Sequence, residues 1–150
     1  TKNQYWDHHG SIMNRLPEST TKVDQPAAAL VKDLKQRGLL DSTVVHWGGE
    51  MGRLPVIQND TGVKNVGRDH NTYGFSMWVA GGGIKAGTSY GLTDDFSYNI
   101  VENPVHIRDL NATILHCLGM DHNRFTFSFQ GLNQKPTGVM PAHVVDGILS

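Results

Sequence analysis

The spacing of apolar residues predicts a first helix over residues 25–37. Its apolar positions recur every three or four residues and would form one face: Ala27, Leu30, Val31 and Leu34. Asp24 is a suitable N-cap, and Pro26 falls in the first turn, where its missing N–H costs little. Gly38 follows the last helical position and suits the left-handed conformation that ends many helices.

A second helix is predicted over residues 104–118, with Gly119 after its last turn. Its buried stripe would consist of Ile107, Leu110, Ile114, Leu115 and Leu118. His106 and Asp109 lie three positions apart at its start. We interpret them as residues that cap the helix rather than as catalytic groups.

Short apolar runs predict a buried strand at residues 43–47 and a second strand at 75–80, each followed by glycines. A weaker alternation predicts an edge strand at 125–130, and a last short helix is expected over 142–149. This order predicts an α/β fold in which helices cover both faces of a sheet. Two helices are too few to cover such a sheet, and the sequence opens at Thr1 without a signal peptide. We therefore expect the chain to be one part of a larger domain.

Composition narrows the function classes mainly by exclusion. A net charge of −1 gives no basic field for nucleic acid and no polybasic patch for a membrane surface. The single cysteine, Cys117, excludes an intrachain disulfide. No apolar run reaches the length of a membrane span. We expect neither a nucleic-acid partner nor a membrane span.

Metal-binding residue types are concentrated in three loops that flank the predicted strands. Ligands of open α/β sheets bind where the strands end, so this placement favours one shared site. In residues 6–10, Asp7 and His9 could place an oxygen and a nitrogen on one cation. The alternative is a loop with a solvated aspartate and a capped histidine.

The other two loops add carboxylates, a histidine and two arginines. Glu50 comes directly after the first strand, and Arg53 could hold an anion in bidentate fashion. The alternative is a strand-ending turn with an exposed Glu50–Arg53 pair. Residues 67–71 read Gly-Arg-Asp-His-Asn, which is either a second ligand cluster or a capping turn in which Asp69 accepts backbone amides. The ligands expected to converge in one pocket are Asp7, His9, Glu50, Asp69 and His70.

Taken together, the order of these motifs is similar to that of a large bacterial sulfatase-like family, usually labelled a domain of unknown function, in the alkaline phosphatase superfamily. The motifs that carry the resemblance are residues 6–10, 23–26, 47–53, 67–71, 80–85 and 102–115. The resemblance covers nearly all of this chain but only the C-terminal part of the family domain. It implies an alkaline-phosphatase-like α/β fold, export to the periplasm or the medium, and a nucleophile on a segment before Thr1.

The resemblance also implies roles for individual residues. Asp7 and His9 match a first pair of metal ligands, Glu50 the carboxylate after a strand, and His70 a later histidine, with Asp69 as an extra ligand. The cofactors would be divalent ions, with zinc, manganese, calcium and magnesium all open. Arg53 or Arg68 would hold the substrate anion.

These expectations predict a metal-dependent hydrolase of a phosphate or sulfate ester. Two divalent cations would polarise the ester oxygen and stabilise the leaving group. The substrate would be a small anionic ester or a sulfated or phosphorylated glycan, and the missing N-terminal part of the domain would be a partner. The alternative is a non-catalytic sulfatase-like protein that uses the same pocket for binding or serves as a structural part of an exported assembly.

Overall fold

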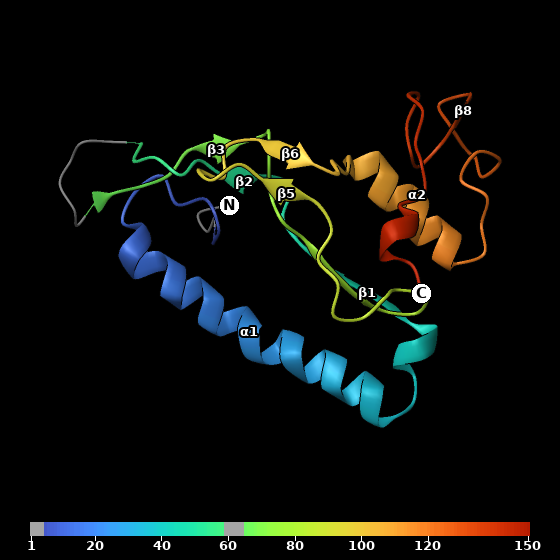
Figure 1. Ribbon diagram of the computed structural model, residues 1–150, viewed down its shortest axis with the longest axis horizontal. Helices are drawn as coiled ribbons and strands as arrows, with labels where there is room; N and C mark the ends of the chain where they lie inside the picture. Colours follow the sequence, from blue (N-terminus) through green and yellow to red (C-terminus); the bar gives the residue numbers. More distant parts are fainter. Residues whose placement is uncertain (1–4, 59–64) are drawn as a thin grey trace.

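The computed structural model describes residues 5–58 and 65–150 (Figure 1). Its helices are α1 (Ile12–Gln36) and α2 (Ile107–Cys117), with the short 3₁₀ helices η1 (Leu40–Ser42) and η3 (Asp146–Ile148). Its strands are β1 (Val44–Trp47), β2 (Gly52–Arg53), β3 (His70–Asn71), β4 (Trp78–Gly81), β5 (Leu92–Thr93), β6 (Ile100–Glu102), β7 (Phe127–Phe129) and β8 (Leu132–Gln134). In Figure 1, α1 lies along one side of the molecule, and α2 lies at the end where β1 begins.

The strands of the described residues pair two by two, and every pairing is antiparallel. β1 pairs with β4, β2 with β3, β5 with β6, and β7 with β8. These short ribbons do not test the prediction of one alkaline-phosphatase-like α/β sheet covered by helices on both faces. It stays a prediction.

The first helix begins far earlier than its apolar pattern predicted. α1 starts at Ile12, so the expected N-cap at Asp24 is wrong, and Pro17 and Pro26 both lie inside the helix. The preceding turns contain an exposed Glu18–Lys22 ion pair of 2.8 Å at i,i+4 spacing, which supports the helix weakly. Pro26 therefore lies in the interior of the helix rather than in its first turn, and it removes one backbone hydrogen bond there.

The predicted C-terminal end of this helix is confirmed. Gly38 has φ 69°, in the left-handed region that glycine tolerates best. The N–H groups of Gly38 and Leu39 donate to the carbonyls of Lys35 (3.1 Å) and Leu34 (2.9 Å). This pair of bonds is a Schellman motif, which satisfies carbonyls that a helix end leaves open.

The β1–β4 ribbon agrees in part with the predicted strands. β1 falls where expected, whereas β4 begins at Trp78 rather than residue 75. The interpretation of β1 as buried is wrong, since His46 and Trp47 are exposed. Trp47 lies opposite Trp78 in the register, and their rings are nearly parallel.

The second helix confirms the predicted capping pair. The His106 side chain accepts the N–H of Arg108, and the Asp109 carboxylate accepts the N–H of His106 at 3.1 Å. Near the C-terminus, the expected edge strand appears as the β7–β8 hairpin, and only η3 forms where a last helix was expected.

The core among the described residues is small. Its buried apolar side chains are Leu110, Ala112 and Val145, and the Thr113 hydroxyl accepts the Val145 N–H at 2.9 Å. Many large apolar side chains are exposed, including Phe96 and Phe129. The prediction that this chain is part of a larger domain stays a prediction. Among the described residues, neither helix has both the length and the apolar character that a membrane crossing requires.

Candidate metal centre

Three segments that are distant in sequence meet beside the N-terminal end of α1. The loop before α1 is held to residues 65–69 by backbone hydrogen bonds, from Arg68 N to His8 O and from Ile12 N to Val66 O, each of 3.0 Å. The third segment is β2, which pairs with β3 so that Arg53 lies opposite His70. The backbone bonds bring the first and third predicted loops into one site, and the pairing adds Arg53 of the second loop.

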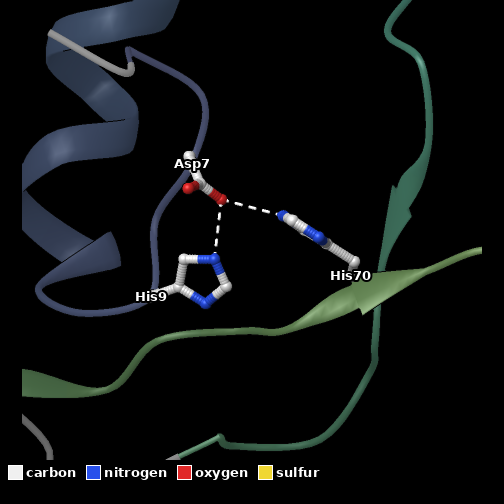
Figure 2. Close-up of side chains that lie close together, drawn as sticks. All are labelled: Asp7, His9 and His70. Atoms are coloured by element: carbon white, nitrogen blue, oxygen red, sulfur yellow. Dashed lines mark hydrogen bonds and ion pairs between the residues drawn. The ribbon is translucent and has the colours of Figure 1, made fainter. Parts of the chain in front are cut away.

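Asp7, His9 and His70 form the centre of the site (Figure 2). Asp7 Oδ1 lies 2.8 Å from His9 Nε2 and 2.9 Å from His70 Nε2. One ligand atom from each residue lies within 4.8 Å of the other two. Ligand atoms around a tetrahedral zinc ion are about 3.4 Å apart, as follows from bonds of about 2.0–2.1 Å. The cluster therefore has the residue types and nearly the spacing of a cation site.

The far side of the His9 ring fixes which of its nitrogens faces the cluster. His9 Nδ1 lies 2.6 Å from Gln58 Oε1 and 3.9 Å from Asp69 Oδ1. Nδ1 therefore faces Gln58, and Nε2 is directed at Asp7. A neutral His9 with its proton on Nδ1 would offer the Nε2 lone pair, which is the form that binds a metal ion. Such outer contacts orient metal-binding histidines in proteins.

Arg53 supplies positive charge at the edge of the cluster. Its Nη1 lies 2.9 Å from Asp7 Oδ1, and its Nη2 donates to Trp6 O at 2.8 Å. The hydrogen bond from His70 is the largest influence on Asp7. With Arg53 and His9, it outweighs the opposing effect of burial and lowers the pKa of Asp7 to about 2. Asp7 is therefore an anion at all physiological pH values, as a cation ligand must be.

The lowered pKa of Asp7 predicts an acid-dependent contribution to stability. A carboxyl whose folded pKa lies below its ordinary value of 3.8 stabilises the fold above that value. The contribution is lost as the pH falls through the folded pKa of about 2. The difference in free energy of unfolding between the metal-free protein and Asp7→Asn should stay constant from pH 6 to about 4 and then shrink. Chemical denaturation in chelator at each pH measures it, and a difference that stays flat down to pH 2 would contradict this.

The other predicted site residues lie around the cluster rather than in it. The Asp69 carboxylate accepts the backbone N–H of His70 at 2.8 Å, which agrees with the capping alternative, and it also lies near His9. Arg68 donates from Nη1 to Leu54 O at 3.0 Å, so one of its donors holds the β2 segment. Glu50 is exposed and does not belong to the three-residue group. The roles of Glu50 as a ligand and of Arg53 and Arg68 as anion binders stay predictions.

Two contributions were not found by sequence reasoning. Gln58 was missed because a glutamine in a polar loop carries no distinguishing pattern. His8 is 4% exposed, and neither of its ring nitrogens has a hydrogen-bond partner among the described residues. Burial lowers the pKa of His8, followed by the charges of Arg53 and Arg15. His8 is therefore a neutral packing residue, and only its backbone carbonyl serves the site.

Asn71 fixes the strand that carries His70. Its side chain is 1% exposed and donates to the carbonyls of Ser97 (3.2 Å) and Tyr98 (3.1 Å). Its oxygen accepts the N–H of Tyr73 at 2.9 Å. One amide thus joins β3 to the turn between β5 and β6.

Asn71→Ala should therefore lower the free energy of unfolding by about 2–3 kcal/mol, because it leaves buried backbone groups without partners. Thermal or chemical denaturation measures the loss. The exposed Asn133→Ala is the matched control and should change stability by no more than about 0.5 kcal/mol. Equal effects of the two substitutions would show that the Asn71 amide does not hold β3.

Comparison with known proteins identifies the family. The chain matches the family described as "Protein of unknown function (DUF1501)" over residues 1–149. The protein therefore belongs to this family, and the match covers almost the whole of the chain. No curated protein and no solved structure matches the chain.

This finding corrects the resemblance drawn from the motifs. The matching family is one of unknown function, and nothing in the match connects it with sulfatases or with the alkaline phosphatase superfamily. The assignment to that superfamily is wrong. Loops that combine Asp, His, Arg and Gly beside strands recur wherever a protein gathers ligands for a cation or an anion. The order of such loops is therefore weaker evidence for ancestry than for chemistry.

Proposed function

We propose that this protein binds a divalent metal ion through Asp7, His9 and His70 and uses it to hydrolyse a phosphate or sulfate ester. The observation that supports the proposal most strongly is the convergence of one carboxylate and two imidazole nitrogens within 4.8 Å. These residues come from two loops that only the fold brings together. The described residues contain one such group, so the proposal needs one ion rather than the two expected from the sequence.

The types of ligand favour zinc or manganese over calcium or magnesium. Calcium and magnesium take oxygen ligands almost exclusively, whereas two of the three ligands here are imidazole nitrogens. Two histidines and one carboxylate are also the protein ligands of many catalytic zinc sites. Three protein ligands leave coordination positions open for water and substrate, which distinguishes catalytic from structural sites.

The chemistry of an anionic ester fits the charges around the cluster. A bound cation supplies polarisation of the ester oxygen and a water of lowered pKa. Arg53 adds a fixed positive charge 2.9 Å from Asp7 Oδ1. Asp7 and the His9–Gln58 contact hold the imidazoles in place, so that little reorganisation accompanies the reaction. In this proposal, the negatively charged group of the ester binds to Arg53 and to the open coordination positions of the metal ion.

Metal loading and turnover measured on one preparation test this proposal. The protein at its natural length is stripped with chelator and reloaded separately with zinc, manganese, magnesium, calcium or iron(II). Hydrolysis of p-nitrophenyl phosphate and p-nitrophenyl sulfate is then followed. We expect zinc or manganese to bind at one ion per chain and to restore turnover. Stoichiometric binding without turnover of either ester would favour the non-catalytic alternative, and turnover restored by iron(II) alone would contradict the assignment of zinc or manganese.

Glu50→Gln gives a test of the ligand set. Glu50 lies outside the three-residue group, so we expect this substitution to weaken zinc binding by less than about tenfold, below the usual effect of outer-sphere changes. Isothermal titration of the stripped protein with zinc measures the affinity. A loss of more than about 100-fold would return Glu50 to the ligand set and would mean that the loop after β1 moves when the ion binds.

A further inference from the structure

A cavity of about 460 Å³ opens between α1 and the β1–β4 ribbon. Its aromatic lining is Trp6, Trp47 and Trp78, which are all the tryptophans of the chain. Its α1 side consists of small and apolar residues together with Thr21 and Asp24. Concave sites that combine apolar walls with a few polar groups are the usual form of small-ligand sites.

The three indole rings form two walls. Trp47 and Trp78 are nearly parallel, with an interplanar angle of 10° and centroids 6.3 Å apart. Trp6 is nearly perpendicular to Trp47, at 87° and 6.4 Å. Each ring remains accessible, with exposed fractions of 42% for Trp6, 41% for Trp47 and 38% for Trp78. Exposed indole faces of this kind offer large, rigid contact area to a flat partner.

The polar side of the cavity is suited to hydroxyl groups. Asp24 is exposed and has no hydrogen bond or ion pair with the other described residues, so both of its oxygens can accept. The Thr21 hydroxyl donates to Pro17 O at 2.7 Å, which leaves its oxygen lone pairs for a ligand donor. A carboxylate beside indole faces can bind neighbouring hydroxyls while the C–H face of a sugar ring covers the indole.

The cavity adjoins the metal cluster. Trp6 is the residue before Asp7. Its carbonyl accepts a hydrogen bond from the Arg53 guanidinium, which also contacts Asp7. A ring lying against Trp6 would therefore bring its substituents close to Asp7, since neighbouring Cα atoms are only about 3.8 Å apart.

We propose that this three-tryptophan cavity binds a neutral sugar ring and is the glycan subsite of the adjoining metal centre. This inference rests on the proposed function and specifies its substrate as a glycan ester. A quaternary ammonium ligand fits less well, since such ligands need aromatic faces on several sides of one point. Here two of the three rings are nearly parallel.

Tryptophan fluorescence gives a direct test, because every tryptophan of the chain lines the cavity. Cellotetraose and β-1,4-galactotetraose are titrated into the natural-length protein in the presence of chelator. At least one should change the emission saturably, and Asp24→Asn should weaken that binding about tenfold because it removes charged acceptors. Asp33→Asn, on the same helix but outside the cavity, is the matched control and should bind like the unchanged protein.

The outcomes separate this inference from the proposed function. Sugar binding that persists in chelator and in Asp7→Asn supports the subsite even if turnover is never found. Zinc binding and turnover without a saturable response to either sugar would overturn the subsite alone. A response to tetramethylammonium but to neither tetrasaccharide would overturn the sugar assignment, as would equal sugar affinities of Asp24→Asn and Asp33→Asn.

Discussion

Replacing Asp7 with asparagine is expected to lower zinc affinity by more than about 100-fold, beyond the range of outer-sphere changes. Asp7 is the only carboxylate of the three-residue group, and its oxygen lies within 2.9 Å of both histidines. The amide keeps the size of the side chain but removes the negative charge that a divalent ion requires. Isothermal titration of the stripped protein with zinc measures the change, and circular dichroism checks that the fold is retained.

Gln58→Ala provides a graded comparison for the same experiment. Gln58 contacts only the far nitrogen of the His9 ring, at 2.6 Å, so its loss should weaken zinc binding about tenfold. The proposed ligand set therefore predicts that the loss of zinc affinity is largest for Asp7→Asn, smaller for Gln58→Ala and smallest for Glu50→Gln. If Asp7→Asn left the zinc affinity unchanged, the assignment of Asp7, His9 and His70 as the zinc site would be contradicted.

Gly67→Ala should damage both the fold and the metal centre. A Cβ at Gly67 would lie 2.1 Å from the carbonyl carbon and oxygen of His9 and 2.5 Å from Gly10 N. These are backbone atoms, so the two loops must separate, and the Arg68–His8 hydrogen bond that joins them would be lost. We expect the free energy of unfolding to fall by about 3 kcal/mol, at the upper end of overpacking effects, and zinc binding to be lost.

Gly10→Ala is the matched control on the facing loop. A Cβ at Gly10 would meet only Asn65 O, at the ordinary contact distance of 3.7 Å. Its stability and zinc affinity should stay close to those of the unchanged protein. If Gly67→Ala behaves in the same way, then the close approach of the two loops is not what assembles the cluster.

The elements that sequence alone predicted well are those with a local signal. The end of α1 at Gly38 and the capping pair at the start of α2 depend on residues within one helical turn. The start of α1 was mispredicted because proline was taken as a boundary, whereas the helix begins at Ile12 and runs through both Pro17 and Pro26. β1 was found by its β-branched run, but its exposure could not be known without its surroundings.

The candidate site was predicted in part for similar reasons. Asp7, His9 and His70 could be proposed from residue type and from their place beside strands. Their contact depends on the pairing of β2 with β3 and on the packing of Gly67 against His9, which are long-range features. Glu50 was included because it follows a strand, yet the three-residue group forms without it. Gln58 contacts His9 only because the fold places it there, so no sequence pattern could have identified it.

The most direct test of the metal centre is a crystal structure of the zinc-loaded protein with anomalous data at the zinc edge. The account predicts one peak per chain, about 2.0–2.2 Å from a carboxylate oxygen of Asp7 and from Nε2 of both His9 and His70. At least one further coordination position should be filled by water. A zinc peak located elsewhere, with both histidines still directed at Asp7 alone, would contradict the account.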